Sequence, residues 1–509
     1  MRVCDLPARL GFHSRPKHRP VYLCAQSVPH PAQGIANRCR SISTRTCLVN
    51  FSTIAKNLWL PFVIFALFLT AIAFRPLLPV DETRYMTVAW EMFLRQGWLQ
   101  PLTVNFEPYH HKPPLLFWLI NLSWSVFGIS RWAGLIPIVL FSMACVYLTG
   151  FLSKRLFPEI QDRQRVQLIM AGGIPFMIYG TLVMFDFVLC AFVLLSLICL
   201  YYFRQERHLR YALLMGLCFG MGVLTKGPVA YLYVLPVALL APFWMKEFSR
   251  PAQWYGGILA ALAVSVLPVL FWLVPVLKAA DSDFAFWLVW NQTAGRITGN
   301  FNAAHVRPFW FYLPFIPVIF MPWLFFPSFW RGLSHAKAGL NGHEGLRFLA
   351  FWLVPVVIAF SLISGKQPHY LVPLVPGVAM LASYCLQRLE TRTLVKAFAA
   401  VLVLFIGGQM IASHNFLKRY TLEYVADIVK TQPTRDLAFV SSYHGELGFM
   451  ARRETPVDSL QIEQLAAWFE AHPDGWAVVR FKDDQPEIKN LKMIFAHRYR
   501  GKNLGVFEK

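Results

Sequence analysis

Apolar residues form long runs, separated by short polar segments, along most of the first 414 residues. The runs fall near residues 58–79, 115–128, 131–152, 166–185, 187–203, 211–225, 228–244, 254–277, 309–330, 348–364, 369–386 and 394–412. A helix needs about 17–25 apolar residues to cross a bilayer, and most of the runs reach this length. The pattern predicts an all-α polytopic membrane protein with about 11–13 transmembrane helices.

The polar segments between the runs differ in charge. Lys and Arg gather in residues 153–165, 204–210, 245–250, 331–347 and 387–396. Positively charged loops stay on the cytoplasmic side, so the remaining connections and the tail after residue 413 belong on the other side. The run 115–128 disturbs this alternation, because residues 115–152 need an odd number of crossings. It is short for a full span, so we expect it to be re-entrant or only partly embedded.

The two ends of the chain differ from the apolar portion. Residues 415–509 alternate helical and strand patterns (TLEYVADIVKT, DLAFVSS, IEQLAAWFEAH, GWAVVRF and a strand pair near 491–507), which predicts a small C-terminal α/β domain. Residues 1–50 carry Lys and Arg against a single acid, Asp5. They are either a disordered basic tail or an over-extended start of translation. The expected organisation is therefore 1–50, a membrane domain over 51–414, and the α/β domain over 415–509.

Composition supports the membrane class and removes two others. Hydrophobic residues make up 56% of the chain and charged residues 15%, against about 25% charged in soluble domains. The net charge of +21 lies largely in the short loops, as the topology rule predicts, so it does not indicate a nucleic-acid partner. The nine cysteines show no zinc-type spacing, and none lies in residues 415–509, which excludes a disulfide framework there.

The segments expected outside the cytoplasm carry an unusual set of polar side chains. Asp81, Arg84 and Tyr85 are spaced i, i+3, i+4 and so share one face of a helix. Lys112 precedes an apolar run in NFEPYHHKPPLL, and Asp186 interrupts the apolar stretch LVMFDFVLC, where an unpaired carboxylate is costly. The other members of the set are Lys226, Arg296, Asn300, His305, Arg307, Lys366, His369 and Tyr370.

Purely structural roles are open to each residue taken alone. They are a capping pair for Asp81 with Arg84, a helix end for Asp186, snorkelling anchors for Lys226 and Lys366, and a hydrogen-bonded surface histidine for His305. Taken together, however, the cations recur on the side of the membrane where positive charge is normally depleted. This placement indicates an anionic ligand at the outer membrane face.

A phosphate attached to a polyprenyl lipid fits such a site, because its tail suits the bilayer and its charge lies at the surface. When a sugar leaves this phosphate, the anion needs electrostatic stabilisation more than a general acid, and one carboxylate suffices as the base. We therefore predict Asp81 as the catalytic base, and Asp186 is the second candidate catalytic residue. The residues predicted to bind the donor phosphate are Arg84, Lys112, Lys226, Arg296 and Lys366. Those predicted to bind the rest of the substrate are Tyr85, His305, His369 and Tyr370.

The order of short motifs over roughly residues 55–415 resembles one family. The motifs are Asp-Glu-x-Arg-Tyr at 81–85, Lys-Pro-Pro at 112–114, Asp186, Lys-Gly-Pro at 226–228, Pro-Phe-Trp-Phe-Tyr at 308–312 and Lys-x-Pro-His-Tyr at 366–370. The series is similar to that of the lipid A aminoarabinosyltransferases and their protein O-mannosyltransferase-like relatives. The resemblance implies the GT-C glycosyltransferase fold, with a periplasmic α/β tail after the last helix.

The resemblance also implies roles for particular residues. Asp81 matches the essential aspartate of the first loop and Asp186 its second acidic position, while Lys112 and Arg296 match cations on the donor phosphate. Two positions depart from the family, which usually has Glu where this chain has His111 and His near Asn291. Both family positions are linked with a metal, so these departures argue against a zinc site of the family's form in this chain. A divalent ion stays a possible cofactor, with His111 as its candidate ligand. No organic cofactor is expected.

These observations predict a multi-pass glycosyltransferase of the bacterial inner membrane, with its active site and C-terminal domain facing the periplasm. It would move a sugar from a polyprenyl-phosphate donor onto lipid A or a related envelope acceptor, with inversion at the sugar carbon. The expected partners are that donor, that acceptor and membrane lipids. A protein O-glycosyltransferase or mannosyltransferase of the same fold is one alternative, and a lipid or solute transporter is another.

Overall fold

The computed structural model describes residues 51–160, 162–280, 282–288, 306–482 and 485–509. The predicted basic segment 1–50 lies outside this part of the chain. Two compact units divide the chain, Met1–Leu58 and Trp59–Lys509. The first unit contributes only the start of helix α2 (Phe51–Phe74), and everything below concerns the second unit.

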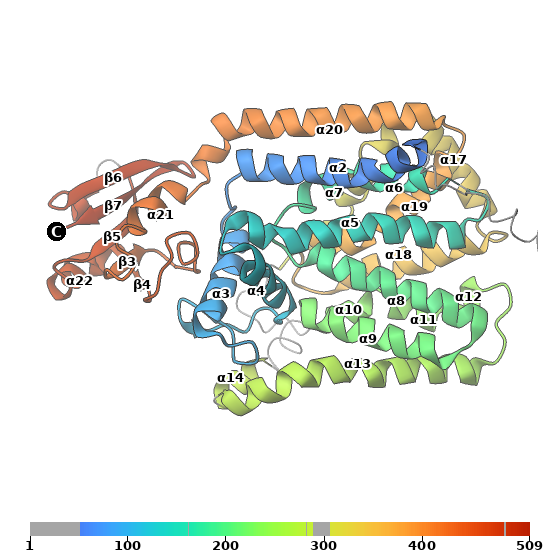
Figure 1. The fold of residues 1–509 in the computed structure, drawn as a ribbon, viewed down its shortest axis with the longest axis horizontal. Coiled ribbons are helices and arrows are strands. Elements are labelled where there is room, and N and C mark those ends of the chain that lie inside the picture. The colour runs from blue at the N-terminus through green and yellow to red at the C-terminus, as the bar shows by residue number, and fades with distance from the viewer. Residues whose placement is uncertain (1–50, 161, 281, 289–305, 483–484) are drawn as a thin grey trace, which may run out of the picture. The chain divides into compact units, whose positions relative to one another are not determined.

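Six helices among the described residues are long and apolar enough to cross a membrane. They are α5 (Arg131–Leu156), α8 (Asp186–Glu206), α9 (Leu209–Lys226), α13 (Pro251–Ala279), α18 (Glu344–Leu362) and α20 (Thr391–His414). They run roughly along one direction (Figure 1), and α2 lies beside α20, where the rings of Trp59 and Phe398 are 5.7 Å apart. The predicted all-α polytopic membrane domain is confirmed.

Four of the predicted apolar runs are helical but broken. Run 166–185 gives α6 (Arg163–Ala171) and α7 (Ile174–Tyr179), and run 228–244 gives α10 (Val229–Leu232), α11 (Leu235–Leu239) and α12 (Ala241–Trp244). Run 309–330 gives η2 (Phe309–Tyr312), α16 (Phe315–Phe320), η3 (Trp323–Phe325) and the start of α17 (Pro327–Gly339). Run 369–386 gives η4 (Pro368–Leu374) and α19 (Val375–Cys385). Prolines stand at or near most of the breaks, because proline lacks the N–H that would continue the helix.

The basic loops meet at one end of the helices, which we call the basic end. His343 contacts Glu159 at 2.8 Å, and Arg204 pairs with Glu344 at 2.5 Å. Arg165 donates to the Leu389 carbonyl at 2.7 Å. These contacts join loops 153–165, 204–210, 331–347 and the start of 387–396. They place these loops at one end, as their charge predicts.

The opposite end, which we call the site end, carries two further helices. α3 (Asp81–Arg95) is followed by the short strands β1 (Thr103–Val104) and β2 (Glu107–Pro108) and then by α4 (Leu115–Phe127). α4 has 13 residues and is therefore about 20 Å long, too short for a bilayer core of about 30 Å. It packs beside α3 and α5, and within residues 115–152 α5 is the helix that is long and apolar enough to cross. The predicted parity problem is thereby removed.

The C-terminal domain is a five-stranded sheet with helices on both faces. Its strand order is β4 (Asp458–Leu460), β3 (Leu437–Val440), β5 (Trp476–Phe481), β7 (Lys502–Glu508) and β6 (Lys492–Tyr499), parallel from β4 to β5 and antiparallel beyond. Alternate residues of β3 face α21 (Glu423–Val429) and α22 (Leu465–Ala471), as the two-residue period of a strand requires. The α/β domain is confirmed, and the short strand β4 is an addition to the prediction.

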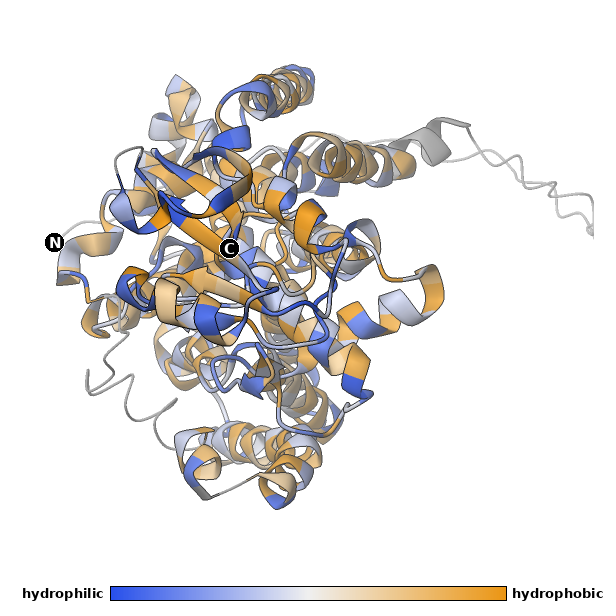
Figure 2. Ribbon diagram, turned by 90° about the vertical axis from the view of Figure 1, so that its left-hand side faces the viewer, coloured by the Kyte–Doolittle hydropathy of each residue, from blue (hydrophilic) through white to orange (hydrophobic). Residues whose placement is uncertain are grey.

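One stretch of the C-terminal domain, residues 443–457, docks on α3; we call it the docking segment. Thr87 of α3 donates to the Gly445 carbonyl at 2.6 Å, and Trp90 donates to the Arg453 carbonyl at 2.8 Å. Asn105 forms two hydrogen bonds with the backbone of Val457, at 2.7 and 2.9 Å. Figure 2 shows this domain in front, with largely hydrophilic loops, and hydrophobic helices behind it.

Candidate active site

α3 presents the first group of predicted residues. It begins at Asp81, so the carboxylate lies in the first turn, where the helix dipole favours negative charge. Arg84 donates to Asp81 Oδ1 at 2.6 Å, and the Tyr85 hydroxyl donates to the same oxygen at 3.2 Å. The predicted i, i+3, i+4 face is therefore present. The Asp81 side chain is 47% exposed, so a substrate can reach it.

The charges around Asp81 keep it ionised. Burial raises the pKa of Asp81, but the positive charges of Arg84 and Lys112 together lower it below its usual value. Burial and the Asp81 charge both raise the pKa of Tyr85, so this hydroxyl remains a hydrogen-bond donor. A carboxylate that stays charged and accessible is suited to accept a proton.

Asp186 and Lys226 form the second group. Asp186 begins α8 and Lys226 ends α9, and their carboxylate and amino groups are 2.5 Å apart. The side chains are only 2% and 5% exposed, so this ion pair is buried. The Lys226 amino group also lies 4.9 Å from the centre of the Tyr370 ring. Asp186 Oδ2 is enclosed and has no hydrogen-bond partner among the described residues.

Aromatic contacts join the two groups into one site. The Lys112 amino group lies 5.9 Å from the ring of Phe185, the residue before Asp186. Phe185 in turn packs edge-on against Tyr85, with ring centres 4.9 Å apart. His369 lies within electrostatic range of Asp81, Lys112, Asp186 and Lys226. The structure therefore brings together eight of the predicted residues, which are Asp81, Arg84, Tyr85, Lys112, Asp186, Lys226, His369 and Tyr370.

Lys366 is placed differently from the other predicted cations. Its side chain is buried, and its amino group donates to the Arg307 carbonyl at 2.9 Å. The adjacent Gly365 pairs with Val306 in an isolated β-bridge. Lys366 thus holds the segment that follows residues 289–305. The predicted residues Arg296, His305 and Asn300 lie outside the described part of the chain.

His111 lies in a group of rings. Its ring centre is 4.6 Å from that of His110 and 5.3 Å from that of Tyr109, and His110 is 4.0 Å from Trp287. Among the described residues, no group of three or more His, Cys, Asp or Glu side chains is arranged to hold a metal ion. The described residues alone therefore do not make a complete metal site around His111.

The sequence did not single out one buried ion pair beside the site. Arg75 and Glu82 are 2.6 Å apart, and their side chains are 8% and 3% exposed. The available signals were an arginine just after the apolar run that forms α2 and an acid directly after Asp81. Both resemble ordinary helix-end residues in sequence, and the backbone groups of Thr181 and Val183 that they also bind lie more than 100 residues along the chain.

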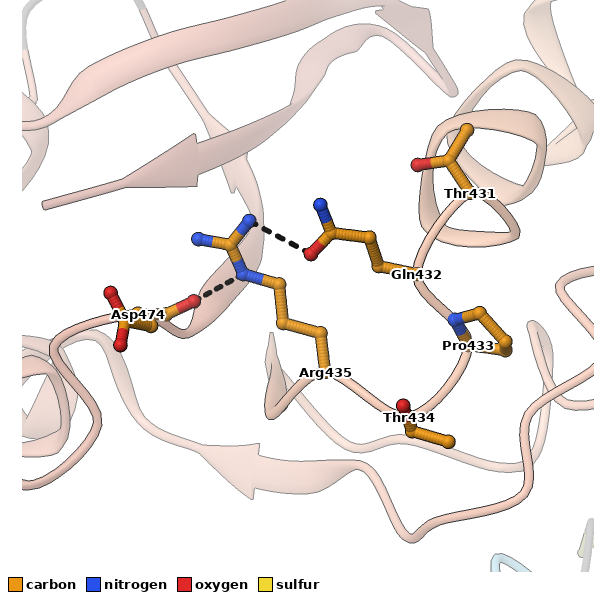
Figure 3. Close-up of a pocket in the computed structure, with 6 residues that line it drawn as sticks. All are labelled: Thr431, Gln432, Pro433, Thr434, Arg435 and Asp474. Atoms are coloured by element: carbon orange, nitrogen blue, oxygen red, sulfur yellow. Dashed lines mark hydrogen bonds between the residues drawn. The ribbon is translucent and has the colours of Figure 1, made fainter.

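A large hollow in the C-terminal domain does not compete with this site. It has a volume of about 610 Å³ and lies between Thr431–Arg435 and Asp474 (Figure 3). Arg435 donates to Gln432 Oε1 at 3.1 Å and to the Asp474 carbonyl, and it also stacks on Trp476. The polar groups that line the hollow bind one another and so connect two turns of the C-terminal domain. We therefore assign the hollow a structural role.

Comparisons with known proteins agree with the motifs. Residues 111–272 match the family model described as dolichyl-phosphate-mannose-protein mannosyltransferase. The chain is 33% identical over 318 residues to the undecaprenyl phosphate-alpha-4-amino-4-deoxy-L-arabinose arabinosyl transferase of Pseudomonas paraeruginosa, a match covering 61% of this chain and 56% of that protein. The protein of the same description from Proteus mirabilis is 29% identical over 328 residues, covering 62% and 57%. This chain thus spans little more than half the length of these relatives.

A solved structure extends the likeness to nearly the whole chain. The crystal structure of ArnT from Cupriavidus metallidurans bound to undecaprenyl phosphate superposes with a TM-score of 0.70 at 15% sequence identity. The superposition covers 89% of this chain and 98% of that one. The chain therefore has the fold of this ArnT, a GT-C fold, and resembles the aminoarabinosyl transferases in sequence, as its ordered motifs predict.

Proposed function

We propose that this chain is a membrane glycosyltransferase that moves a sugar from a polyprenyl-phosphate donor onto lipid A or a related envelope acceptor. The observation that carries the proposal is the convergence of an accessible, ionised Asp81 with Arg84 and Lys112 at one end of the helices. The likeness in fold to a transferase crystallised with undecaprenyl phosphate supports the choice of donor.

The cations divide by their surroundings into two kinds. Lys226 is neutralised by Asp186 at 2.5 Å, so this pair adds little net charge to the site. Lys366 is directed to the Arg307 carbonyl. Arg84 also pairs with Asp81, at 2.6 Å, but that pair is partly exposed to solvent, and Lys112 is a second positive charge that lowers the pKa of Asp81. We assign Arg84 and Lys112 to the donor phosphate. Arg296, in the segment that follows α14 (Ser282–Phe286), remains a predicted third contact.

The reaction follows from these assignments. Asp81 accepts the proton of the acceptor hydroxyl as the acceptor oxygen attacks the sugar carbon. The bond from that carbon to the phosphate oxygen breaks, and its electron pair stays on the phosphate. Arg84 and Lys112 stabilise the phosphate anion, which leaves without needing a proton. A single displacement of this kind inverts the configuration at the sugar carbon.

We infer that the site end faces the periplasm. The basic loops meet at the opposite end, and loops rich in Lys and Arg stay in the cytoplasm. The membrane is the bacterial inner membrane if the acceptor is an envelope lipid. This orientation places the C-terminal domain and its docking segment on the periplasmic side.

One observation favours a second acceptor. The family model that matches residues 111–272 is described by a protein mannosyltransferase activity. A protein hydroxyl could be activated by Asp81 in the same way as a lipid hydroxyl. The two functions therefore share donor and mechanism, and they differ in where the sugar arrives.

The test compares cells that lack the protein with cells that carry the wild type, Asp81→Asn or Asp474→Asn. Asp474 is an exposed carboxylate of the C-terminal domain and serves as the matched control. Mass spectrometry of lipid A should show a sugar addition with the wild type and Asp474→Asn only. Sugar in the protein fraction would indicate the second acceptor. Movement of substrate across vesicles without any transfer would overturn the enzyme proposal in favour of a transporter.

A further inference from the structure

The buried pair of Arg75 and Glu82, seven residues apart, connects the segment between α2 and α3 with a turn more than 100 residues further along the chain. Arg75 follows the end of α2, and Glu82 lies in the first turn of α3, next to Asp81. Their charged groups are 2.6 Å apart, and both side chains are almost completely enclosed. Their remaining hydrogen bonds reach the turn formed by residues 181–183.

The pair holds both sides of this turn. Glu82 Oε1 accepts from the backbone N–H of Val183 at 2.8 Å, and Arg75 Nη2 donates to the Thr181 carbonyl at 2.6 Å. Glu82 Oε2 also accepts from the backbone N–H of Leu78, at 3.0 Å. One carboxylate and one guanidinium therefore fix the connection before α3 and the connection before α8.

These two connections carry the two carboxylates of the site. Asp81 is adjacent to Glu82, and Asp186 lies three residues after Val183, at the start of α8. A change in the separation of these connections would move Asp81 relative to the pair of Asp186 and Lys226. Misplacement of reacting groups by about 1 Å can cost about 100-fold in rate.

Glu82 is not placed to take part in the chemistry itself. Both of its oxygens accept hydrogen bonds from the protein, and its side chain is 3% exposed. Nor does stability alone explain the pair, because replacing a buried ion pair with neutral residues is often neutral or stabilising. A positional role explains both the burial and the choice of partners.

We propose that Arg75 and Glu82 are a positioning pair that sets the distance between Asp81 and Asp186. The proposal rests on the proposed function, since it assigns these two carboxylates to one active site. The new element of the proposal is that two buried side chains, which a substrate does not contact, fix the relative position of the catalytic groups.

The first test separates positioning from stability by comparing Glu82→Gln with the double variant Arg75→Met/Glu82→Gln. The single variant leaves Arg75 buried without its counter-ion, so it should lower the melting temperature and the transfer rate together. The double variant removes both charges and should regain much of the melting temperature. Its kcat should remain about 10–100-fold low, with a KM for the donor within about threefold of the wild type. A double variant with wild-type kcat would overturn the proposal.

The second test does not depend on enzyme activity. Hydrogen–deuterium exchange should become about tenfold faster in residues 178–185 of the double variant. The reason is that the introduced side-chain amide has one acceptor oxygen for two backbone N–H groups, and the Thr181 carbonyl loses its donor. The control Arg204→Met/Glu344→Gln removes an ion pair at the basic end and should leave this segment unchanged. Unchanged exchange in residues 178–185 of the double variant at the site end would overturn the positioning role. A wild-type chain that transfers no sugar would instead overturn the proposed function.

Discussion

The two ends of the helices contain ion pairs of equal length in different surroundings. Arg204 and Glu344 at the basic end are 2.5 Å apart, with side chains 22% and 20% exposed. Lys226 and Asp186 at the site end are also 2.5 Å apart, but 5% and 2% exposed. A pair open to solvent joins loops at little cost, whereas burying two charges is expensive. The difference fits the proposed function, in which the Lys226–Asp186 pair belongs to the active site and the Arg204–Glu344 pair joins the basic loops.

The largest expected effect concerns the base. Asp81→Asn should lower the transfer rate by about 100–10,000-fold, because a positioned general base contributes that factor. Glu344→Gln, the matched change at the basic end, should leave the rate within about twofold. Transfer of a labelled sugar by purified protein in vesicles measures both. Equal losses in the two variants would remove the functional difference between the ends.

The next effect concerns stability. Lys226→Met leaves Asp186 buried without its partner and should cost about 3–5 kcal/mol in the free energy of unfolding. Arg204→Met at the basic end should cost about 1 kcal/mol or less, because its partner Glu344 remains partly exposed. Thermal unfolding in detergent would compare them. Similar melting temperatures for the two variants would contradict the burial argument.

A smaller change is expected in donor binding. Lys112→Ala should raise the KM for the lipid-phosphate donor by about 10–100-fold, since a hydrogen bond to a charged group contributes about 1.5–3 kcal/mol. Lys246→Ala removes an exposed lysine at the basic end and should leave the KM unchanged. Initial rates at several donor concentrations give the answer. If the KM rises in both variants, the cause is the lower net positive charge of the protein, and Lys112 has no specific role in donor binding.

The pH dependence should reveal the charges around Asp81. Because its pKa lies below the usual value, the base form is present above that depressed pKa and is lost only as the pH falls through it. Arg84→Met removes a nearby positive charge, so the acid limb of the rate profile should move to higher pH. Arg204→Met, at the other end, should leave the limb where it is. A limb that stays in place in Arg84→Met would exclude Asp81 as the titrating group.

The smallest effect concerns the docking segment. A Cβ atom at Gly448 would collide with Cγ2 of Thr87, so Gly448→Ala should shift α3 and lower the transfer rate severalfold. Gly256→Ala, on α13 with open space around it, is the control and should be silent. The same assay and a melting curve would show both. An unchanged rate in Gly448→Ala would mean that a shift of α3 at its contact with the docking segment does not affect transfer.

Sequence patterns predicted what depends on neighbours along the chain. The apolar runs, the basic loops and the alternating tail each carry a local signal, and the structure places them as expected. The pairing of Lys226 with Asp186 and the hydrogen bond from Val183 to Glu82 could not be read in this way. These contacts join residues 40 and 101 positions apart, and only the packing of the helices brings them together.

Broken helices were missed for another reason. Hydropathy averages over a window, so a proline or glycine inside an apolar run leaves the average high. Pro175, Pro236 and Pro242 each stand at the start of a new short helix within such a run. The short strand β4 escaped because three residues at a sheet edge carry almost no periodic signal.

The close approach of Gly445 to Val104 and of Gly448 to Thr87 also limits how this protein can be rearranged by recombination. A related C-terminal domain grafted after α20 would have to supply two residues without side chains at the same places, along with carbonyls for Thr87 and Trp90. A graft lacking them would collide with α3, the helix that begins at Asp81. The membrane portion and the C-terminal domain should therefore be inherited as a matched set, and hybrids between distant relatives should express poorly.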